Sequence, residues 1–140
     1  MSSLQQQSPY GQYINFLSQG VFAFQRDIVT GNAVFFPRVV APRSGSVALE
    51  WEVSQGLGRV YATTTVHYRG EQPLNVALIS MDEGFRVMSR VEGIGPDDVT
   101  IGMRVCVRIN KAQEGSDPYP VFVPFAQSRD KLKNSKEEAR

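Results

Sequence analysis

Few residues in this sequence have the types and spacing that catalysis requires. The 140-residue chain contains one histidine, His67, and one cysteine, Cys106, which excludes an internal disulfide and a site built from several Cys and His ligands. It has no G-x-S-x-G, Walker or G-x-G-x-x-G motif. His67 with Glu71 is the best available acid–base pair, so a stand-alone thioesterase or hydratase stays open as an alternative. A surface or hydrogen-bonded structural histidine is the default interpretation.

Arginines form the second group of candidate functional residues. Arginines that lie on the same side of neighbouring strands form either a solvated sheet surface or an anion-binding face. On an anion-binding face, Tyr61 could stack on a base or an adenine ring. Arg38 and Arg43 lie in a linker beside aromatic residues 35–36, and this cluster could hold a cofactor phosphate or an acidic partner surface. The arginines expected on the polar phase of their strands are Arg59, Arg86, Arg90, Arg104 and Arg108.

A short amphipathic helix is expected near the N-terminus. Ser8 has the type of an N-cap, with proline at the first helical position, and Gly20 provides a stop. Tyr13, Phe16 and Leu17 recur at helical spacing and form an apolar stripe. The stripe either packs on its own domain or docks a partner, and Phe36 is a further candidate docking residue.

The elements that must position these residues are mostly strands. Apolar runs at 21–25 and 33–36 flank a Gly-Asn turn and predict a small hairpin. Alternating residues over 58–91, with turn residues between three runs, predict an antiparallel meander. Further alternation at 47–53 and 103–110, and a proline-flanked run at 119–125, predict more strands, the last at a sheet edge. We therefore expect a mainly β protein with an OB-fold-like antiparallel barrel.

The expected domain organisation follows from composition. We predict a flexible arm over 1–8, the helix and hairpin over 9–45, the barrel over 46–126 and a flexible charged tail over 127–140. With 15 Lys and Arg against 14 Asp and Glu, the formal net charge of +1 gives no global attraction to nucleic acid. A nucleic-acid-binding OB module using the arginine face remains an alternative.

The same composition gives expectations about the cell. No apolar run is long enough for a membrane span, and the first residues lack the order of a signal peptide. A single cysteine suits a reducing compartment. We expect a cytoplasmic protein without a membrane partner, for which self-association through the barrel edges is open.

The order of the motifs resembles the acyl-CoA-associated OB-fold proteins, a family with an N-terminal helix and a rubredoxin-like zinc ribbon ahead of the barrel. The resemblance covers roughly residues 10–125. After the helix, hairpin and F-P-R linker come four motifs: G-x-V-Y-x-x-T-x-V-H, P-x-x-V-A-L-I-x-x-D-E-G-x-R, I-G-M-x-V and P-V-F-x-P.

The chain departs from that family at the zinc ligands. Where the family reads C-x-x-C-G and C-P-x-C-G, this chain keeps the glycines but has lost all four thiolates. The residues at the four positions are Asp27, Thr30, Ala41 and Ser44. They cannot hold zinc in tetrahedral coordination, so we expect a metal-free ribbon held by its apolar residues.

The resemblance implies a non-catalytic accessory subunit in acyl-CoA and lipid metabolism. Its partner would be a thiolase-like enzyme or an acyl-CoA hydratase or dehydrogenase. The helix and ribbon would dock that enzyme, while Arg38 and Arg43, with Tyr61 and His67, would lie near coenzyme A or acyl-CoA shared with it. No tightly bound cofactor is expected.

Overall fold

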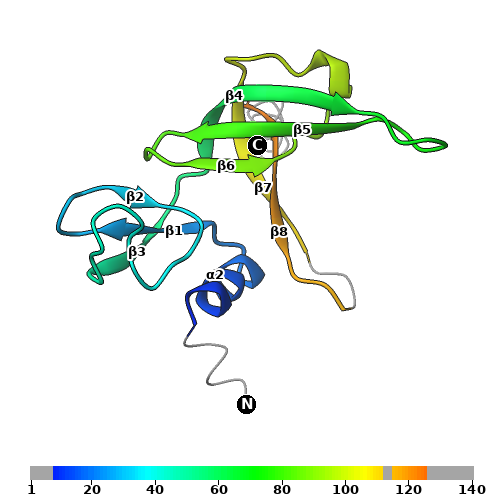
Figure 1. The fold of residues 1–140 in the computed structure, drawn as a ribbon. Helices are drawn as coiled ribbons and strands as arrows, with labels where there is room; N and C mark the ends of the chain where they lie inside the picture. The colour runs from blue at the N-terminus through cyan, green and yellow to red at the C-terminus, as the bar shows by residue number, and fades with distance from the viewer. Residues whose placement is uncertain (1–7, 112–114, 126–140) are drawn as a thin grey trace, which may run out of the picture.

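Two antiparallel sheets and one α-helix make up the described part of the protein (Figure 1). The computed structural model describes residues 8–111 and 115–125. The predicted tail, and the predicted arm apart from residue 8, lie outside the described residues. The helix, α2, and a three-stranded sheet form an N-terminal module, and a five-stranded sheet forms the barrel.

Helix α2 (Pro9–Ser18) begins where the sequence predicts. The Ser8 Oγ accepts a hydrogen bond from the Gly11 N–H at 2.9 Å, so it caps a first turn whose amides have no partner in the helix. Tyr13 and Leu17 are only 4% and 2% exposed because their side chains face the core. The apolar stripe of the helix therefore packs on its own protein.

The three-stranded sheet has the order β2-β1-β3, from β1 (Ala23–Asp27), β2 (Ala33–Val34) and β3 (Leu49–Val53). The β1–β2 hairpin confirms the prediction from the two apolar runs. The strand β3, however, was expected in the barrel, and it pairs along its whole length with β1. The chain thus changes sheet between Val53 and Leu57, not near residue 45, because alternation identifies a strand without identifying its neighbour.

The five-stranded sheet has the strand order β6-β5-β4-β7-β8. A parallel bridge between Val91 and Phe122 joins the chain after β6 to β8 and closes the sheet into a barrel. Together with a 3₁₀ turn at Pro96–Asp98 before β7, this connectivity is that of an OB-fold, as predicted. The strands are β4 (Leu57–Val66), β5 (Leu74–Met81), β6 (Arg86–Ser89), β7 (Arg104–Asn110) and β8 (Tyr119–Pro124).

A β-bulge in β4 changes which residues share a face. The pairing with β5 shifts between Val60, opposite Ile79, and Ala62, opposite Leu78. Strict alternation along 58–66 would put Val60, Ala62, Thr64 and Val66 on one face. That expectation is wrong, because Val60 is 2% exposed whereas Ala62 and Thr64 are exposed. An extra residue reverses the side-chain phase beyond it, and single-sequence alternation does not reveal that.

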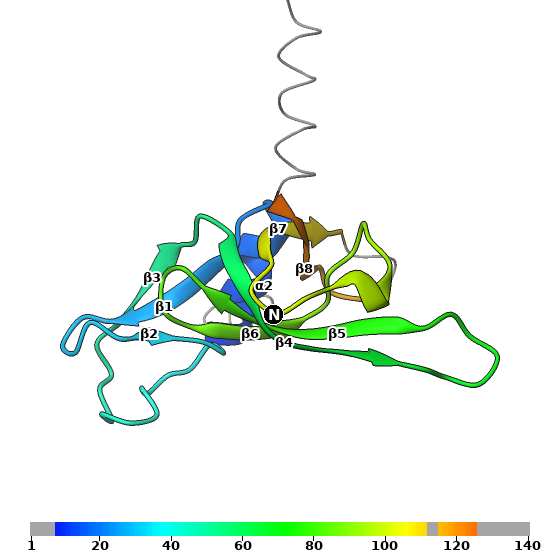
Figure 2. The same ribbon diagram turned by 90° about the horizontal axis from the view of Figure 1, so that it is seen from above.

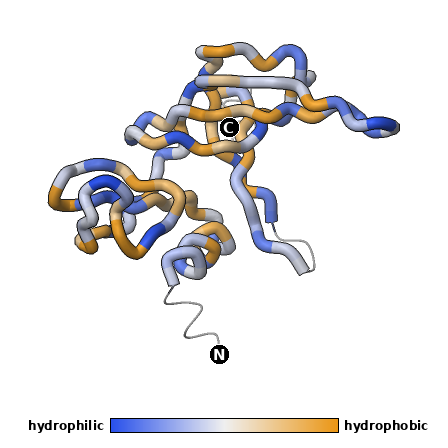
Figure 3. The backbone as a smooth tube through the Cα atoms, viewed as in Figure 1, coloured by the Kyte–Doolittle hydropathy of each residue, from blue (hydrophilic) through white to orange (hydrophobic). Residues whose placement is uncertain are grey.

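One aromatic core joins the module to the barrel. The Phe24 and Phe85 rings stack with centroids 4.8 Å apart, and Phe22 packs against both Phe85 and Phe122. Phe24 and Phe122 are fully buried. Hydrophobic residues are frequent along the barrel strands (Figure 3), and those on the inner face form this core. Within the described residues, no helix is long and apolar enough to span a membrane.

Candidate functional site

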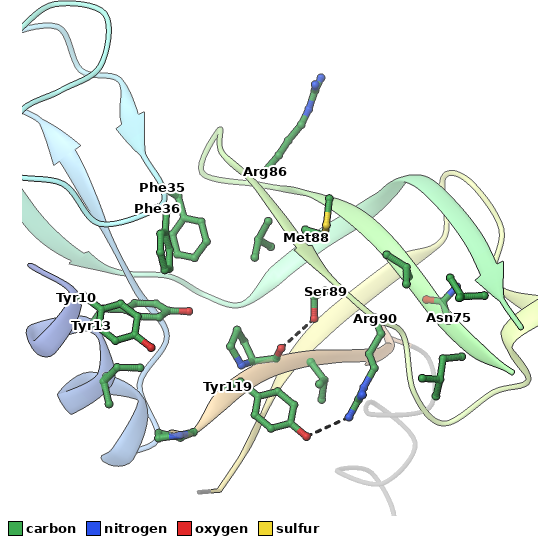
Figure 4. A pocket seen from close by; sticks show the side chains of 18 of the residues that line it. Tyr10, Tyr13, Phe35, Phe36, Asn75, Arg86, Met88, Ser89, Arg90 and Tyr119 are labelled. Atoms are coloured by element: carbon green, nitrogen blue, oxygen red, sulfur yellow. Dashed lines mark hydrogen bonds between the residues drawn. The ribbon is translucent and has the colours of Figure 1, made fainter. Parts of the chain in front are cut away.

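A groove of about 660 Å³ lies between the N-terminal module and the barrel. Helix α2 and the segment after β2 form one wall, and β6 with the start of β8 forms the other (Figure 4). We call it the β6 groove, because five consecutive residues, 86–90, line it. Its apolar and aromatic lining residues include Tyr10, Tyr13, Phe35, Phe36, Met88 and Tyr119.

Aromatic contacts set the module wall of the β6 groove. Phe36 packs edge-on against Tyr10 and Tyr13, with ring centroids 5.8 and 5.9 Å apart. The Tyr10 hydroxyl donates a 3.0 Å hydrogen bond to Oδ2 of Asp117, in the loop before β8. Burial, followed by this hydrogen bond, raises the pKa of Tyr10, and burial raises the pKa of Tyr13. Both phenols are therefore neutral at physiological pH and serve as wall and hydrogen-bond donor, not as bases.

A buried amide holds the segment that carries Phe36. Gln25 in β1 is 5% exposed, and its Nε2 donates to the Arg38 carbonyl at 2.8 Å. Its Oε1 accepts from the Arg38 N–H at 2.7 Å. This pair of bonds fixes the backbone between β2 and the linker, so the exposed ring of Phe36 is presented by a braced segment.

The barrel wall carries two arginines in different surroundings. The Arg86 guanidinium lies 3.8 Å from the centroid of the Tyr61 ring. Arg90 is bonded to Glu92 by its Nε, at 2.6 Å, and to the Tyr119 hydroxyl by an amino group, at 3.1 Å. Among the described residues, Arg86 forms no ion pair with a carboxylate, so its charge is the one at this wall that an anion could neutralise.

A second cavity, of about 570 Å³, lies on the ribbon side of the first, and we call it the ribbon cavity. Arg43 and Ser44 line it from the linker, and Gly84 lines it from the β5–β6 turn. Phe35 and Arg86 line both cavities, so the two are neighbours. Arg43 and Arg86 make the ribbon cavity cationic at two points.

The four positions of the lost zinc ligands converge beside the ribbon cavity. Asp27 is 1% exposed, and its Oδ2 accepts a 2.7 Å hydrogen bond from Ser44 Oγ. Hydrogen bonds from Ser44, the Val29 amide and neighbouring hydroxyls lower the pKa of Asp27, with burial opposing them. One carboxylate, two hydroxyls and the methyl of Ala41 do not make a zinc ligand set, which needs thiolate, imidazole or several carboxylates.

Most arginines of the predicted polar face are engaged with carboxylates. Two amino groups of Arg104 bond the two carboxylate oxygens of Asp82, at 2.7 and 2.6 Å. Glu92 bonds both Arg90 and Arg108. Because these cations are already neutralised, the anion-binding interpretation of the face loses most of its charge, and the solvated-surface interpretation fits.

The predicted site residues fall into separate places. Arg43 lines the ribbon cavity. Tyr61 does not line it but packs against Arg86, which does. His67 lies at the β4–β5 hairpin tip, and both views place that tip at the opposite end of the molecule from β1–β3 (Figures 1 and 2). No hydrogen bond or ion pair within the described chain links His67 to Glu71. The acid–base alternative thus gains no geometric support.

Partner docking was predicted for four residues with very different exposure. Phe36 is 52% exposed and Phe16 is half-buried against Trp51, whereas Tyr13 and Leu17 are internal. In this conformation Tyr13 and Leu17 are therefore not available to a partner. Arg86, Met88 and Tyr119, which line the β6 groove, were not singled out as a site because they belong to strands that only the fold brings together.

Comparisons with known proteins support the OB-fold barrel. Residues 51–110 match the family model described as ChsH2, C-terminal OB-fold domain. A DUF35 domain-containing scaffold protein of Methanothermobacter thermautotrophicus is 32% identical over 96 residues, which are 62% of this chain and 71% of that protein. A protein of the same description from Methanocaldococcus jannaschii is 30% identical over 60% of this chain and 64% of its own length.

Three further matches extend the comparison. A probable enoyl-CoA hydratase alpha subunit of Thermomonospora curvata is 34% identical over 63% of this chain, and this chain spans 28% of that protein. The solved structure "Ltp2-ChsH2(DUF35) aldolase" superimposes with a TM-score of 0.73 at 28% identity, covering 83% of this chain and 94% of the other. A DUF35 structure from Sulfolobus solfataricus, at 18% identity and a TM-score of 0.58, covers 76% and 84% and shares the fold.

Fold and site define an OB-fold protein with a ribbon-like N-terminal module whose cavities lie where the two parts meet. With the sequence matches, the particular family follows. The chain belongs to the DUF35 family of acyl-CoA-associated OB-fold proteins.

Proposed function

We propose that this protein is a non-catalytic accessory subunit of an acyl-CoA-processing enzyme. It binds a thiolase-like enzyme, or an acyl-CoA hydratase or dehydrogenase, and contributes part of that enzyme's acyl-CoA site. The scaffold proteins and the hydratase subunit among its relatives, and the aldolase structure that pairs ChsH2(DUF35) with Ltp2 in its name, support this role.

The observation that carries the proposal is the chemistry of the two cavities. Within the described chain, neither cavity is lined by a histidine or a cysteine, and Asp27 is the one carboxylate in either lining. That carboxylate is hydrogen-bonded and has a lowered pKa, so it is a poor general base. What the cavities offer instead is cationic and aromatic surface, which suits binding without catalysis.

The cationic and aromatic residues of this surface suit the phosphates and the adenine ring of coenzyme A. Its phosphates would lie against Arg43 at the ribbon cavity, with Arg38 close by in the same linker. Tyr61, under the Arg86 guanidinium, is 51% exposed and offers a face for the adenine ring. The exposed tip residue His67 takes no part in this arrangement.

An affinity pull-down from the native cell, with the proteins identified by mass, tests the accessory role. We expect a thiolase-like or other acyl-CoA enzyme in near-stoichiometric amount, and recovery of the chain alone or with nucleic acid would contradict the proposal. With the complex in hand, Arg43→Glu should weaken coenzyme A binding. The matched control is Arg69→Glu, an equal charge change at the exposed hairpin tip outside both cavities.

A further inference from the structure

One edge of strand β6 is directed into the β6 groove. The Met81 N–H bonds the Phe85 carbonyl at 2.8 Å, and the register then places Val87 opposite Ile79. In an antiparallel pair, hydrogen-bonded and non-hydrogen-bonded residues alternate, so the backbone groups of Arg86 and Met88 point away from β5. They point toward the groove, which residues 86–90 line.

Strand β8 approaches this edge but cannot pair with it further. The Phe122 N–H bonds the Arg90 carbonyl at 3.0 Å, and the Phe122 carbonyl accepts from the Glu92 N–H at 2.7 Å. The next bond of this parallel ladder would need an N–H at residue 120 directed at the Met88 carbonyl. Residue 120 is a proline and has no N–H, so the ladder stops and the two strands part.

The Pro120 carbonyl has a different partner at this point. It accepts a 2.9 Å hydrogen bond from the Ser89 hydroxyl, which ties β8 to β6 without covering the β6 edge (Figure 4). Closure of the barrel at Val91 and Phe122 thus leaves Arg86 and Met88 beyond the last rung. The β6 edge is therefore open because Pro120 cannot donate a hydrogen bond to it.

We propose that the β6 groove binds an extended peptide segment of the partner enzyme, which adds a strand beside β6. The inference rests on the proposed function, which supplies the partner. A second strand satisfies the outward N–H and C=O groups of Arg86 and Met88, which recur every second residue as in any β-ladder. Side chains on one face of the segment would meet the rings of Tyr10 and Phe36, and those on the other would meet Met88, which is 74% exposed.

Charge narrows the chemistry of the segment. No carboxylate of the described chain lines the β6 groove, while Arg86 and Arg90 both do. Arg90 is already bonded to Glu92, so Arg86 is the cation that a ligand would neutralise. The segment should therefore alternate apolar residues and carry a carboxylate that reaches Arg86.

The test uses a displayed random 12-residue peptide library and the full chain as target. We expect enrichment of alternately apolar, acidic peptides, and Met88→Ala, which removes a side-chain contact but keeps the backbone N–H, should weaken their binding less than Met88→Pro does. Met88→Pro removes the outward N–H without touching a β5 hydrogen bond, and it should weaken binding about tenfold or more, the loss expected for a backbone hydrogen bond plus steric blockage.

A peptide-side control covers a folding defect in the proline variant. Two versions of an enriched peptide are made, one with N-methyl groups on its odd-numbered residues and one with them on its even-numbered residues. Only one of the two should lose binding to wild type, because only every second backbone N–H of the peptide faces β6. A library without binders, binders indifferent to Met88→Pro and to N-methylation, or displacement of the peptide by free coenzyme A would each overturn the proposal.

The pull-down separates this inference from the proposed function. A partner enzyme recovered equally well with wild type and Met88→Pro would overturn the edge-docking proposal and leave the accessory role intact. Absence of any acyl-CoA enzyme would instead contradict the accessory role.

Discussion

The carboxylate of Asp27 and the hydroxyl of Ser44 are joined by a 2.7 Å hydrogen bond across the two turns where the family resemblance places the zinc-ligand positions. Both turns keep their glycines, Gly31 at φ 81° and Gly45 at φ 71°, conformations that other residues rarely adopt. Both turns therefore have a tight shape that depends on glycine. A hydrogen-bonded carboxylate links the two loops in this chain.

The first prediction concerns stability against pH. Because the folded state lowers the pKa of Asp27 below its ordinary value of 3.8, ionisation of Asp27 stabilises the fold above that value, and the stabilisation is lost as pH falls through the folded pKa. Asp27→Asn should be less stable than wild type at pH 7, and the gap should narrow below pH 3.8. Urea midpoints at pH 7 and in acid measure this.

The companion variant is Ser44→Ala. It removes the principal donor to the carboxylate, and it should lower Tm by roughly 5 °C at pH 7 while leaving the fold unchanged. An unaltered pH profile in Asp27→Asn would show that the carboxylate does not link the turns.

The second prediction is that zinc binding can be restored. Asp27, Thr30, Ala41 and Ser44 occupy the four ligand positions, and the side chains of Thr30 and Ser44 both bond Asp27. Replacing all four by cysteine should give a variant that binds about one zinc per chain and loses thermal stability on chelation. Elemental analysis decides this, with the three-cysteine variant that keeps Ala41 as the control for incomplete coordination.

Much of the fold could be predicted because it is specified by local sequence signals. Turn glycines, the helix cap at Ser8 and the alternation in β5 are local signals, and each gave the right element. Of the apolar residues expected to support the ribbon, Phe22, Phe24 and Val34 are buried, and Phe35 is partly buried.

The errors arise where a local pattern depends on distant partners. The bulge after Val60 and the pairing of β3 with β1 depend on neighbouring strands, which the alternation of one strand does not specify. The β6 groove eluded prediction for the same reason, because its walls come from α2, β6 and β8. Pro120 could have signalled the open edge, but only once its neighbour β6 was known.

The third prediction concerns a buried amide behind the β6 groove. Asn75 is 5% exposed, and its Nδ2 donates to Thr63 Oγ1 at 2.8 Å, while its Oδ1 accepts from the Val91 N–H at 2.9 Å. Asn75→Leu leaves the backbone N–H of Val91 without its partner beside the barrel closure. It should lower the free energy of unfolding in urea by roughly 2–3 kcal/mol. Thr64→Ala, at an exposed position, should change the free energy of unfolding by no more than about 0.5 kcal/mol. A similar loss of stability in both variants would refute a specific role for Asn75.

The fourth prediction separates packing from docking in the N-terminal module. Leu17 is 2% exposed, so Leu17→Ala should cost roughly 3 kcal/mol of stability through the cavity it leaves. Phe36 is 52% exposed and contacts Tyr10 and Tyr13 at one side, so Phe36→Ala should cost only about 1 kcal/mol. Fluorescence of Trp51, the single tryptophan, follows unfolding in both variants.

The two variants should behave in the opposite order toward the partner enzyme. At a temperature where both are folded, Phe36→Ala should weaken the complex because an exposed ring is lost from the groove wall, whereas Leu17→Ala should bind as wild type does. If Leu17→Ala, while folded, lost the partner and Phe36→Ala kept it, the helix would have to leave its own core to dock. The packed position of Tyr13 and Leu17 argues for the first order, because exposing them would uncover two of the side chains that close the core.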